Sequence, residues 1–347
     1  MERCIKVLTT EDLAWNDYIG QLPVYMQDIY FTRQYHLLEE KKSDGKAYLF
    51  VYTEMGTEIG LYAFIKRPIE QMSIQGKFFD IETVYGYGGP LVNTENEEFV
   101  RRFEKAFLEY CRNENIIAEF VRFHPLIQNQ TVFKEDIQVL HNRKTVALDL
   151  SPNIDEIWMT QISTQNRNTI RKCIKNNLIV EETEDYEAFM HIYDETMRRV
   201  NADAFYSFEK TYYDELRRDD KNILLCVKYN QQIIAAAIFM GYGEYFHYHL
   251  SGSRKEYLRL APNNILLWEA IRYAKEHGYQ KMHFGGGLSD SMADNLFKFK
   301  SHFSKEYADF YIGKRVHNSE IYNMLIHQWE MQNGKKASLL LQYRTTY

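Results

Sequence analysis

Two apolar runs, each broken by a short turn, lie far apart in the chain and share one pattern. The run from Leu49 to Ile65 predicts two strands around a turn at Met55 and Gly56. Leu224 to Phe239 repeats this pattern around a turn at Asn230. Because strand-length apolar runs flanking a turn signal are typical of hairpins, the sequence predicts the same hairpin twice.

Each predicted hairpin is followed by an aromatic-rich strand, an amphipathic helix and a further strand. In the first copy we expect these three elements at residues 83–87, 97–111 and 116–123. In the second we expect strands at 245–250 and 280–284, with a helix that starts after Pro262-Asn263-Asn264, which supply its cap, and stops at Gly278. Phe99, Phe103 and Phe107 recur every four residues and so mark one apolar helix face. A unit repeated at an offset of roughly 165 to 175 residues predicts a duplicated α+β fold.

A basic stripe lies between the two copies, in a predicted helix. Arg167, Arg171 and Lys175 are spaced by four residues and therefore share one face. Such a stripe suits the phosphates of a nucleotide, a pyrophosphate or a tRNA. A solvated basic face is the alternative interpretation.

The overall charge argues against binding DNA. The chain of 347 residues has 48 acidic and 42 basic side chains and a net charge of -6, so any nucleic acid must be held by a local patch. The four cysteines lie far apart and no two have a C-x-x-C spacing, so the sequence suggests neither a zinc knuckle nor a disulfide framework. A reducing, cytoplasmic compartment is expected.

Long apolar segments are absent from the sequence. The longest uninterrupted run, Ile233 to Met240, is far shorter than the roughly 18 residues that a membrane span needs. The first fifteen residues mix charged and apolar side chains and lack the apolar core of a signal peptide. We therefore expect no membrane span, while a peripheral membrane contact stays open.

Several motifs together resemble a known family. They are the segments RNTIRKCIKNN, YHLSGS, RLAPNNILLWEAI and FKFKSHFSK, the last followed by Tyr311-Ile312-Gly313. The chain looks like the FemABX family of peptidoglycan-bridge aminoacyltransferases and related acyltransferases, and the resemblance extends over nearly the whole chain. Its most specific element is the pair Phe299-Lys300 with Phe303.

The resemblance implies an α+β fold of two tandem GNAT-like domains (Gcn5-related N-acetyltransferase), each a mixed sheet flanked by helices, facing a cleft. The first would comprise residues 1–150 with 317–347, and the second residues 151–316. Family membership also implies acyl transfer to an amine with no metal and no tightly bound cofactor. The implied donor is an aminoacyl-tRNA or an acyl-CoA, and the acceptor an envelope-glycan precursor or nucleotide sugar.

The implied active site centres on Lys300, which matches the family lysine near the reacting carbonyl. A compact ammonium with three donors suits a developing oxyanion. Tyr248 lies on the predicted central strand of the second unit, and in this fold that strand splays from its neighbour to admit the acyl group. We therefore expect Lys300 and Tyr248 in one cleft, acting on one substrate.

The chain departs from the family where a carboxylate is linked to the acceptor. The segment from Tyr85 to Val92 leads to Asn93, so an ionised base is missing there. Water, the substrate, Glu82 or Asp149 are the alternatives for deprotonating the amine. Tyr87 and Asn93 remain predicted contacts to the substrate.

A second departure concerns the acceptor phosphates. Phe208 stands four residues before Tyr212, where the resemblance leads us to expect an arginine. A muramyl-nucleotide acceptor is therefore in question, and Arg198, Arg199 and Tyr206 are predicted to bind another sugar.

Three further groups of residues could suggest a metal site, a phosphate loop or a nucleophile, but each has a structural explanation. His247 and His249 face the same side of a strand, but no third ligand stands at metal spacing, so stacked aromatics are predicted and no metal. The glycines at 285–287 lack P-loop spacing and predict a turn that lines the cleft before Lys300. Cys173 is predicted to pack inward.

Three hypotheses follow. The first is a FemABX-like acyltransferase that acts on an amine of a cell-envelope precursor or amino sugar. The second is a coenzyme A-dependent sugar N-acetyltransferase, although residues 259–264 lack the glycines of a coenzyme A turn and Pro262 removes one N-H donor. The third is a catalytically silent GNAT pair that binds glycan or RNA.

Overall fold

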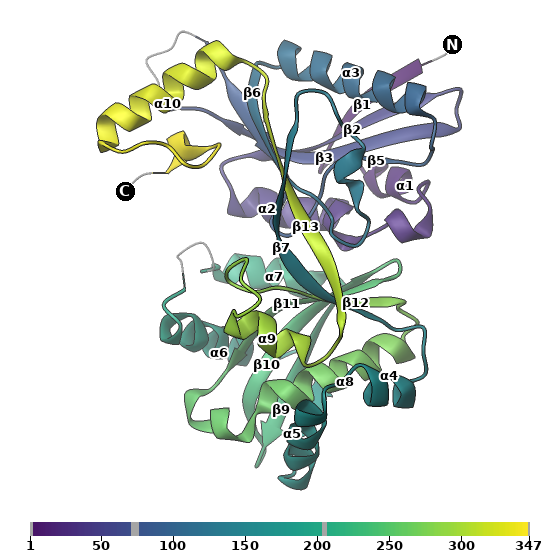
Figure 1. Cartoon of the computed structure of the whole chain (residues 1–347), viewed down its shortest axis with the longest axis vertical. Helices are drawn as coiled ribbons and strands as arrows, with labels where there is room; N and C mark the ends of the chain where they lie inside the picture. The colour runs from purple at the N-terminus through teal and green to yellow at the C-terminus, as the bar shows by residue number, and fades with distance from the viewer. Residues whose placement is uncertain (1–2, 71–75, 203–206, 346–347) are drawn as a thin grey trace. The chain divides into compact units, whose positions relative to one another are not determined.

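The chain forms two compact units in the computed structural model, which describes residues 3–70, 76–202 and 207–345. Unit 1 comprises Met1–Asn142 with Phe310–Tyr347, and unit 2 comprises Arg143–Asp309. The chain passes between them inside strands β7 (Gln138–Asp149) and β13 (Glu306–Val316) (Figure 1). Each division therefore falls within a strand, somewhat before the expected boundaries at 150 and 316.

Unit 1 contains a mixed sheet. Its strands, in spatial order, are β1 (Arg3–Thr9), β2 (Lys46–Glu54), β3 (Glu58–Pro68), β4 (Phe79–Glu82), β6 (Ile116–Arg122) and the end of β13, with β5 (Leu91–Val92) paired to β3. Its helices are α1 (Trp15–Ile19), α2 (Arg33–Lys42), α3 (Glu97–Asn113) and α10 (Ser319–Asn333), with 3-10 turns at Val24–Met26, Ile29–Phe31, Asn129–Thr131 and Gln342–Arg344. Strands β4 and β6 run parallel, and the other pairs described in this unit are antiparallel.

Helix α3 buries the phenylalanine stripe that the sequence predicts. Its N-cap Asn96 accepts hydrogen bonds from the N-H groups of Glu98 and Phe99, which satisfies donors that a helix start leaves free. The rings of Phe99, Phe103 and Phe107 are completely buried. They contact aromatic side chains of β2 and β3, and this aromatic layer forms the core of unit 1.

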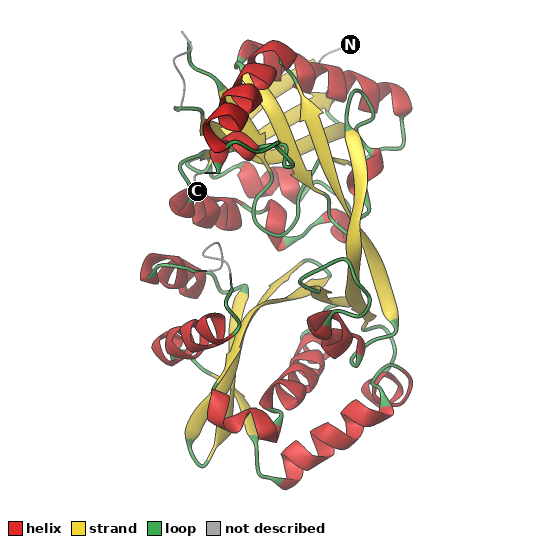
Figure 2. Ribbon diagram, turned by 60° about the vertical axis from the view of Figure 1, so that its left-hand side comes forward, coloured by secondary structure: helices red, strands yellow, loops and turns green. Residues whose placement is uncertain are grey.

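Unit 2 also contains a mixed sheet, with helices on both of its faces (Figure 2). The strand order is β7, β12 (Lys281–Gly286), β11 (Tyr245–Ser253), β10 (Gln232–Tyr242), β9 (Asn222–Tyr229) and β8 (Ile179–Glu182). The helices are α4 (Ile154–Thr160), α5 (Thr164–Lys175), α6 (Tyr186–Arg199), α7 (Lys210–Arg218), α8 (Pro262–Glu276) and α9 (Asn295–Ser301), with a 3-10 helix at Lys255–Leu260.

The predicted repeat is confirmed. Hairpins β2–β3 and β9–β10 are each followed by a strand, a helix and a second strand parallel to the first: β4, α3 and β6 in unit 1, and β11, α8 and β12 in unit 2. The residues at both hairpin turns have positive φ, namely Met55, Gly56, Asn230 and Gln231. The two GNAT-like units predicted from the sequence are therefore present.

Two local expectations were wrong. Residues 83–87 are not a strand, because the strand β4 ends at Glu82 and Gly86 and Gly89 adopt φ near 99° and 97°, outside extended geometry. Gly285 and Gly286 are not a turn, because they continue β12 and pair with Val146 and Thr145 of β7.

The C-terminal helix α10 lies in unit 1, as expected. Across residues 3–70, 76–202 and 207–345, none of the helices has both the length and the apolar character to cross a membrane.

Candidate functional site

The parallel strands β11 and β12 of unit 2 pair over a short stretch and then separate. Residues Tyr245–His247 pair with Lys281–His283. Beyond these, β11 continues to Ser253 and β12 to Gly286, and no pairing joins residues 248–253 to residues 284–286 in the part of the chain that the structure describes. We call this opening the fork.

Each arm of the fork stays attached to its outer neighbour. Strand β11 remains paired with β10 as far as Ser253, and β12 remains paired with β7 as far as Gly286. A bulge interrupts each of these ladders, at Ile238/Phe239 in β10 and between His283 and Gly285 in β12. Bulges bend strands, so they account for the divergence of the two arms.

The equivalent parallel strands of unit 1 remain joined. Beyond the end of β4, the N-H of Thr83 donates to the carbonyl of Phe120, and the N-H of Arg122 donates to Thr83 Oγ1. The N-H of Gly88 then donates to the carbonyl of Arg122, and Gly88 forms a parallel bridge with Phe123. Unit 1 therefore has hydrogen bonds where unit 2 has the fork.

Lys300 lies at the fork. It belongs to α9, whose N-cap Asp294 accepts a hydrogen bond from the N-H of Phe297 at 2.9 Å. Lys300 is only 7% exposed, and its Nζ donates to the carbonyl of Gly286 at 2.7 Å. The same Nζ is 5.8 Å from the ring centroid of Tyr248. The structure thus brings Lys300 and Tyr248 together, one from each side of the fork.

Burial changes the protonation of Lys300. It lowers the pKa of the ammonium to about 7, helped by the charge of Arg143 and opposed by that of Asp294. Among the described residues, no carboxylate forms an ion pair with Nζ. Because a desolvated ammonium without an anionic partner is unfavourable, the neutral amine is well populated near pH 7.

The glycines at the end of β12 make room for this lysine. Gly285 has φ of 77°, and a Cβ at that position would lie 3.3 Å from Lys300 Nζ. A Cβ on Gly287 would lie 2.4 Å from an oxygen of Asp294. Arg143 donates to the carbonyl of Gly287 at 2.8 Å and fixes the strand end. The glycine run therefore positions α9 rather than binding phosphate.

Tyr248 keeps its phenolic proton near neutral pH. Its hydroxyl donates to Ser251 Oγ at 2.5 Å, and its ring stacks on Phe239. Burial raises the pKa of the phenol to about 12, with a smaller opposing effect from Ser251. Tyr248 therefore presents an uncharged phenol at the fork, with its proton shared with Ser251.

The three residues of the basic stripe have different surroundings. One guanidinium nitrogen of Arg167 donates to the carbonyls of Trp158, Met159 and Ile162, which closes the C-terminal end of α4. Arg171 is exposed, with its guanidinium 5.6 Å from the Trp158 ring centroid, and Lys175 is also exposed. The exposed pair is thus available to a ligand, whereas Arg167 is committed to the fold.

Of the predicted sugar-binding residues of unit 2, Arg199 lies at the end of β11. Arg199 donates to the carbonyl of Ser253 at 2.8 Å. Phe208 stacks on Tyr212 at a ring distance of 4.3 Å, and the Tyr212 hydroxyl is 3.0 Å from His249 Nε2. Arg198 is exposed. Tyr206 lies outside the described residues.

The predicted substrate contacts of unit 1 are held by their own neighbours. Asn93 accepts from the N-H of Ile59 at 2.8 Å and donates to the carbonyl of Thr57 at 2.9 Å, so its amide fixes the β2–β3 turn. Tyr87 contacts the rings of Tyr30, His124 and Phe310.

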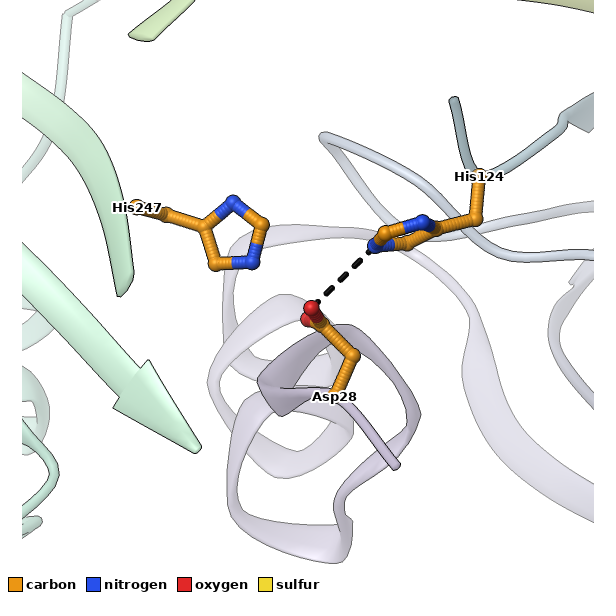
Figure 3. A group of neighbouring side chains, drawn as sticks. All are labelled: Asp28, His124 and His247. Atoms are coloured by element: carbon orange, nitrogen blue, oxygen red, sulfur yellow. Dashed lines mark ion pairs between the residues drawn. The ribbon is translucent and has the colours of Figure 1, made fainter. Parts of the chain in front are cut away.

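A buried contact between a histidine and a carboxylate in unit 1 has no counterpart in the sequence analysis. His124 Nε2 lies 3.1 Å from a carboxylate oxygen of Asp28, and both side chains are completely buried (Figure 3). The N-H groups of Leu126 and Ile127 donate to His124 Nδ1, which leaves the proton on Nε2, facing the carboxylate. No local motif signals this pair, because its members are far apart in the chain.

Comparisons with known proteins agree with this geometry. Residues 164–300, which end at Lys300, match the family model described as an acetyltransferase (GNAT) domain. The crystal structure of FemX has a TM-score of 0.72 and 16% identity, covering 93% of this chain and 99% of that chain. No curated protein matches the chain.

Two further solved structures share the fold. The C-terminal domain (DUF2156) of a putative lysylphosphatidylglycerol synthetase from Agrobacterium fabrum has a TM-score of 0.54 and 14% identity, covering 88% of this chain and 93% of that chain. A conserved protein of unknown function from Bacteroides thetaiotaomicron has a TM-score of 0.54 and 9% identity, covering 90% of this chain and 100% of that chain. The chain therefore shares the fold of FemX, and residues 164–300 match a GNAT acetyltransferase domain.

Proposed function

We propose that this chain transfers an aminoacyl or other acyl group onto an amine of a cell-envelope precursor or amino sugar. The observation that carries the proposal is the fork in unit 2, with Lys300 facing Tyr248. An acyl group inserted between the arms would bring its carbonyl to the strand edge of β11 and to Lys300 Nζ. Donors already positioned at a developing oxyanion lower the barrier to acyl transfer.

The start of α8 supports an aminoacyl-tRNA donor over an acyl-CoA. In GNAT enzymes the turn at this position holds the coenzyme A pyrophosphate on its N-H groups, which exploits the helix N-terminus. Here side chains of α5 contact that turn: Asn166 accepts from Asn264 at 2.7 Å, and Cys173 Sγ lies 3.3 Å from the carbonyl of Leu260. Pro262 lacks an N-H, and the expected asparagine cap is not formed.

The fold relatives support an envelope acceptor. FemX belongs to the family that the sequence resembles, and the family acts on peptidoglycan precursors. The relative from Agrobacterium fabrum is named for the synthesis of lysylphosphatidylglycerol, an aminoacylated lipid. Both names support an amine or hydroxyl of the cell envelope as the acceptor class.

A coenzyme A-dependent sugar N-acetyltransferase is the second candidate, favoured by the match of residues 164–300 to an acetyltransferase model. A silent GNAT pair that binds glycan or RNA is less well supported. Lys300 is buried without a carboxylate ion pair among the described residues, and an apolar residue would pack there equally well, so packing alone does not account for a lysine.

Labelled donors distinguish these functions. The purified protein is incubated with labelled acetyl-CoA and, separately, with tRNA charged with labelled amino acids, each with envelope precursors and amino sugars as acceptors. We expect label to move from charged tRNA to an acceptor amine. Transfer from acetyl-CoA alone would support the second candidate, and no transfer from either donor would contradict both enzymatic functions.

A further inference from the structure

Acyl transfer to an amine requires a group that accepts the amine proton. Asn93 carries no ionisable group, and the two carboxylates considered from the sequence, Glu82 and Asp149, are engaged elsewhere. Asn93 holds the β2–β3 turn, Glu82 forms ion pairs with Arg67 at 2.8 Å and Arg122 at 3.1 Å, and Asp149 accepts from the N-H and hydroxyl of Ser151. None of these residues is placed to take the proton.

At the fork, the amine of Lys300 can accept this proton when it is uncharged. Strand β11 presents the protonated phenol of Tyr248, β12 the carbonyl of Gly286, and β7 the guanidinium of Arg143. Asp294 precedes α9 and caps it, and although burial opposes this, backbone N-H groups, including those of Phe297 and Leu288, hold the pKa of its carboxyl below the usual range. The Asp294 carboxylate favours the ammonium form of Lys300, but burial has the larger effect and lowers the pKa of Lys300.

We propose that Lys300 is the proton shuttle of the transfer reaction. As the acceptor nitrogen forms its bond to the acyl carbon, the neutral Nζ takes one proton from that nitrogen. As the bond from the acyl carbon to the donor oxygen or sulfur breaks, the Lys300 ammonium returns a proton to this leaving atom. The products are the amide and the free hydroxyl or thiol, and Lys300 ends neutral. This inference rests on the proposed function.

The order of these steps gives Lys300 two tasks in succession. It is uncharged when the amine attacks, and it becomes cationic when negative charge develops on the carbonyl oxygen. The bond from Nζ to the Gly286 carbonyl persists in both states, because amine and ammonium both carry N-H donors. No further acid, base or metal is needed for the proton balance.

NMR of protein labelled at lysine Cε tests the protonation without any substrate. Lys300 is assigned from the signal missing in Lys300→Arg, and exposed Lys298 on the same helix is the matched control. We expect Lys300 to titrate near pH 7, well below the ordinary lysine pKa of 10.5. Titration of Lys300 at the ordinary lysine pKa would overturn the shuttle, because the side chain would then be a permanent cation near neutral pH.

The Lys300→Arg variant separates a shuttle from a fixed charge. Arginine keeps the positive charge but does not give up its proton near neutral pH, so we expect turnover to fall about 100-fold or more, as in Lys300→Ala. Small amines such as ethylamine should restore part of the turnover of Lys300→Ala, with a rate that follows the amine pKa. Lys298→Arg is the control and should keep its turnover.

Two failures are distinguishable. An arginine variant that keeps more than a tenth of the turnover would overturn the shuttle and leave the proposed transfer intact. Absence of transfer from every donor would contradict the proposed function, whereas the NMR titration would still report the protonation of Lys300.

Discussion

Lys300 and Tyr248 are expected to contribute to different kinetic constants. Replacing Lys300 with Ala removes the proposed proton shuttle, so kcat should fall by roughly two to three orders of magnitude, with a smaller change in KM. Replacing Tyr248 with Phe removes one hydroxyl and should mainly raise the KM for the acceptor. Steady-state kinetics with Lys298→Ala as control measure both effects, and normal kcat in a folded Lys300→Ala would contradict the assignment.

His36 in unit 1 gives the protein a second, independent pH response. The side chain is 1% exposed, its Nδ1-H donates to the carbonyl of Thr32, and its Nε2 has no partner among the described residues. Burial lowers the pKa of His36 from 6.5 to about 4. The folded state therefore favours the neutral ring, and this contribution to stability is complete above pH 6.5 and declines as the pH falls towards 4.

Because of His36, the free energy of unfolding should be about 2 kcal/mol lower at pH 5 than at pH 7.5. Urea unfolding followed by tryptophan fluorescence measures it, since the Trp15 ring lies 5.0 Å from the imidazole. In His36→Gln the same pH change should cost correspondingly less. An equal pH dependence in the variant and the parent protein would show that His36 does not titrate as expected.

At the scale of elements, α5 combines a structural residue with a candidate binding surface. Arg167→Gln should lower the free energy of unfolding by about 1 to 3 kcal/mol, because three carbonyls at the end of α4 lose their donor. Arg171→Gln with Lys175→Gln should leave stability unchanged and weaken tRNA binding. If both side chains contact phosphates, the slope of log affinity against log salt should decrease by about 1.5. An unchanged affinity and slope would identify the pair as a solvated face.

The secondary structure was predictable where the signal was local. The hairpin turns are marked by Met55-Gly56 and Asn230, and the α3 face by its phenylalanine spacing. The strand at 83–87 was placed wrongly because its aromatic residues dominate the pattern, whereas Gly86 and Gly89 decide the backbone. The residue types at 83–87 favour extended structure. Whether these residues form a strand depends on hydrogen bonding to β6, which comes later in the chain.

The candidate site was predictable only in part, for a related reason. Lys300 was found from the family resemblance and Tyr248 from its place on the central strand. The acceptor for Lys300, the Gly286 carbonyl, and the acceptors for Arg167 are backbone groups that carry no sequence signal. The Asp28–His124 pair likewise depends on the folded chain alone.

At the scale of the whole molecule, the C-terminal segment completes unit 1. Tyr343 and Arg344 donate to a carboxylate oxygen of Asp80 at 3.0 and 2.5 Å, and Asp80 is completely buried. Removing one partner leaves a buried charge, so Arg344→Ala should destabilise unit 1 by about 3 kcal/mol. Hydrogen exchange at the amides of β4 measures this, and exposed Arg101→Ala is the control. Unchanged protection of β4 would contradict the role of the segment.

The joined strands of unit 1 and the fork of unit 2 also have a consequence for stoichiometry. An acyl donor needs separated strand edges, and the chain offers these between β11 and β12, whereas hydrogen bonds through Thr83, Gly88 and Arg122 occupy the equivalent edges of β4 and β6. Although the fold is duplicated, we therefore expect only one donor molecule to bind per chain. Calorimetric titration with a non-hydrolysable analogue of the donor should saturate at one molecule per chain.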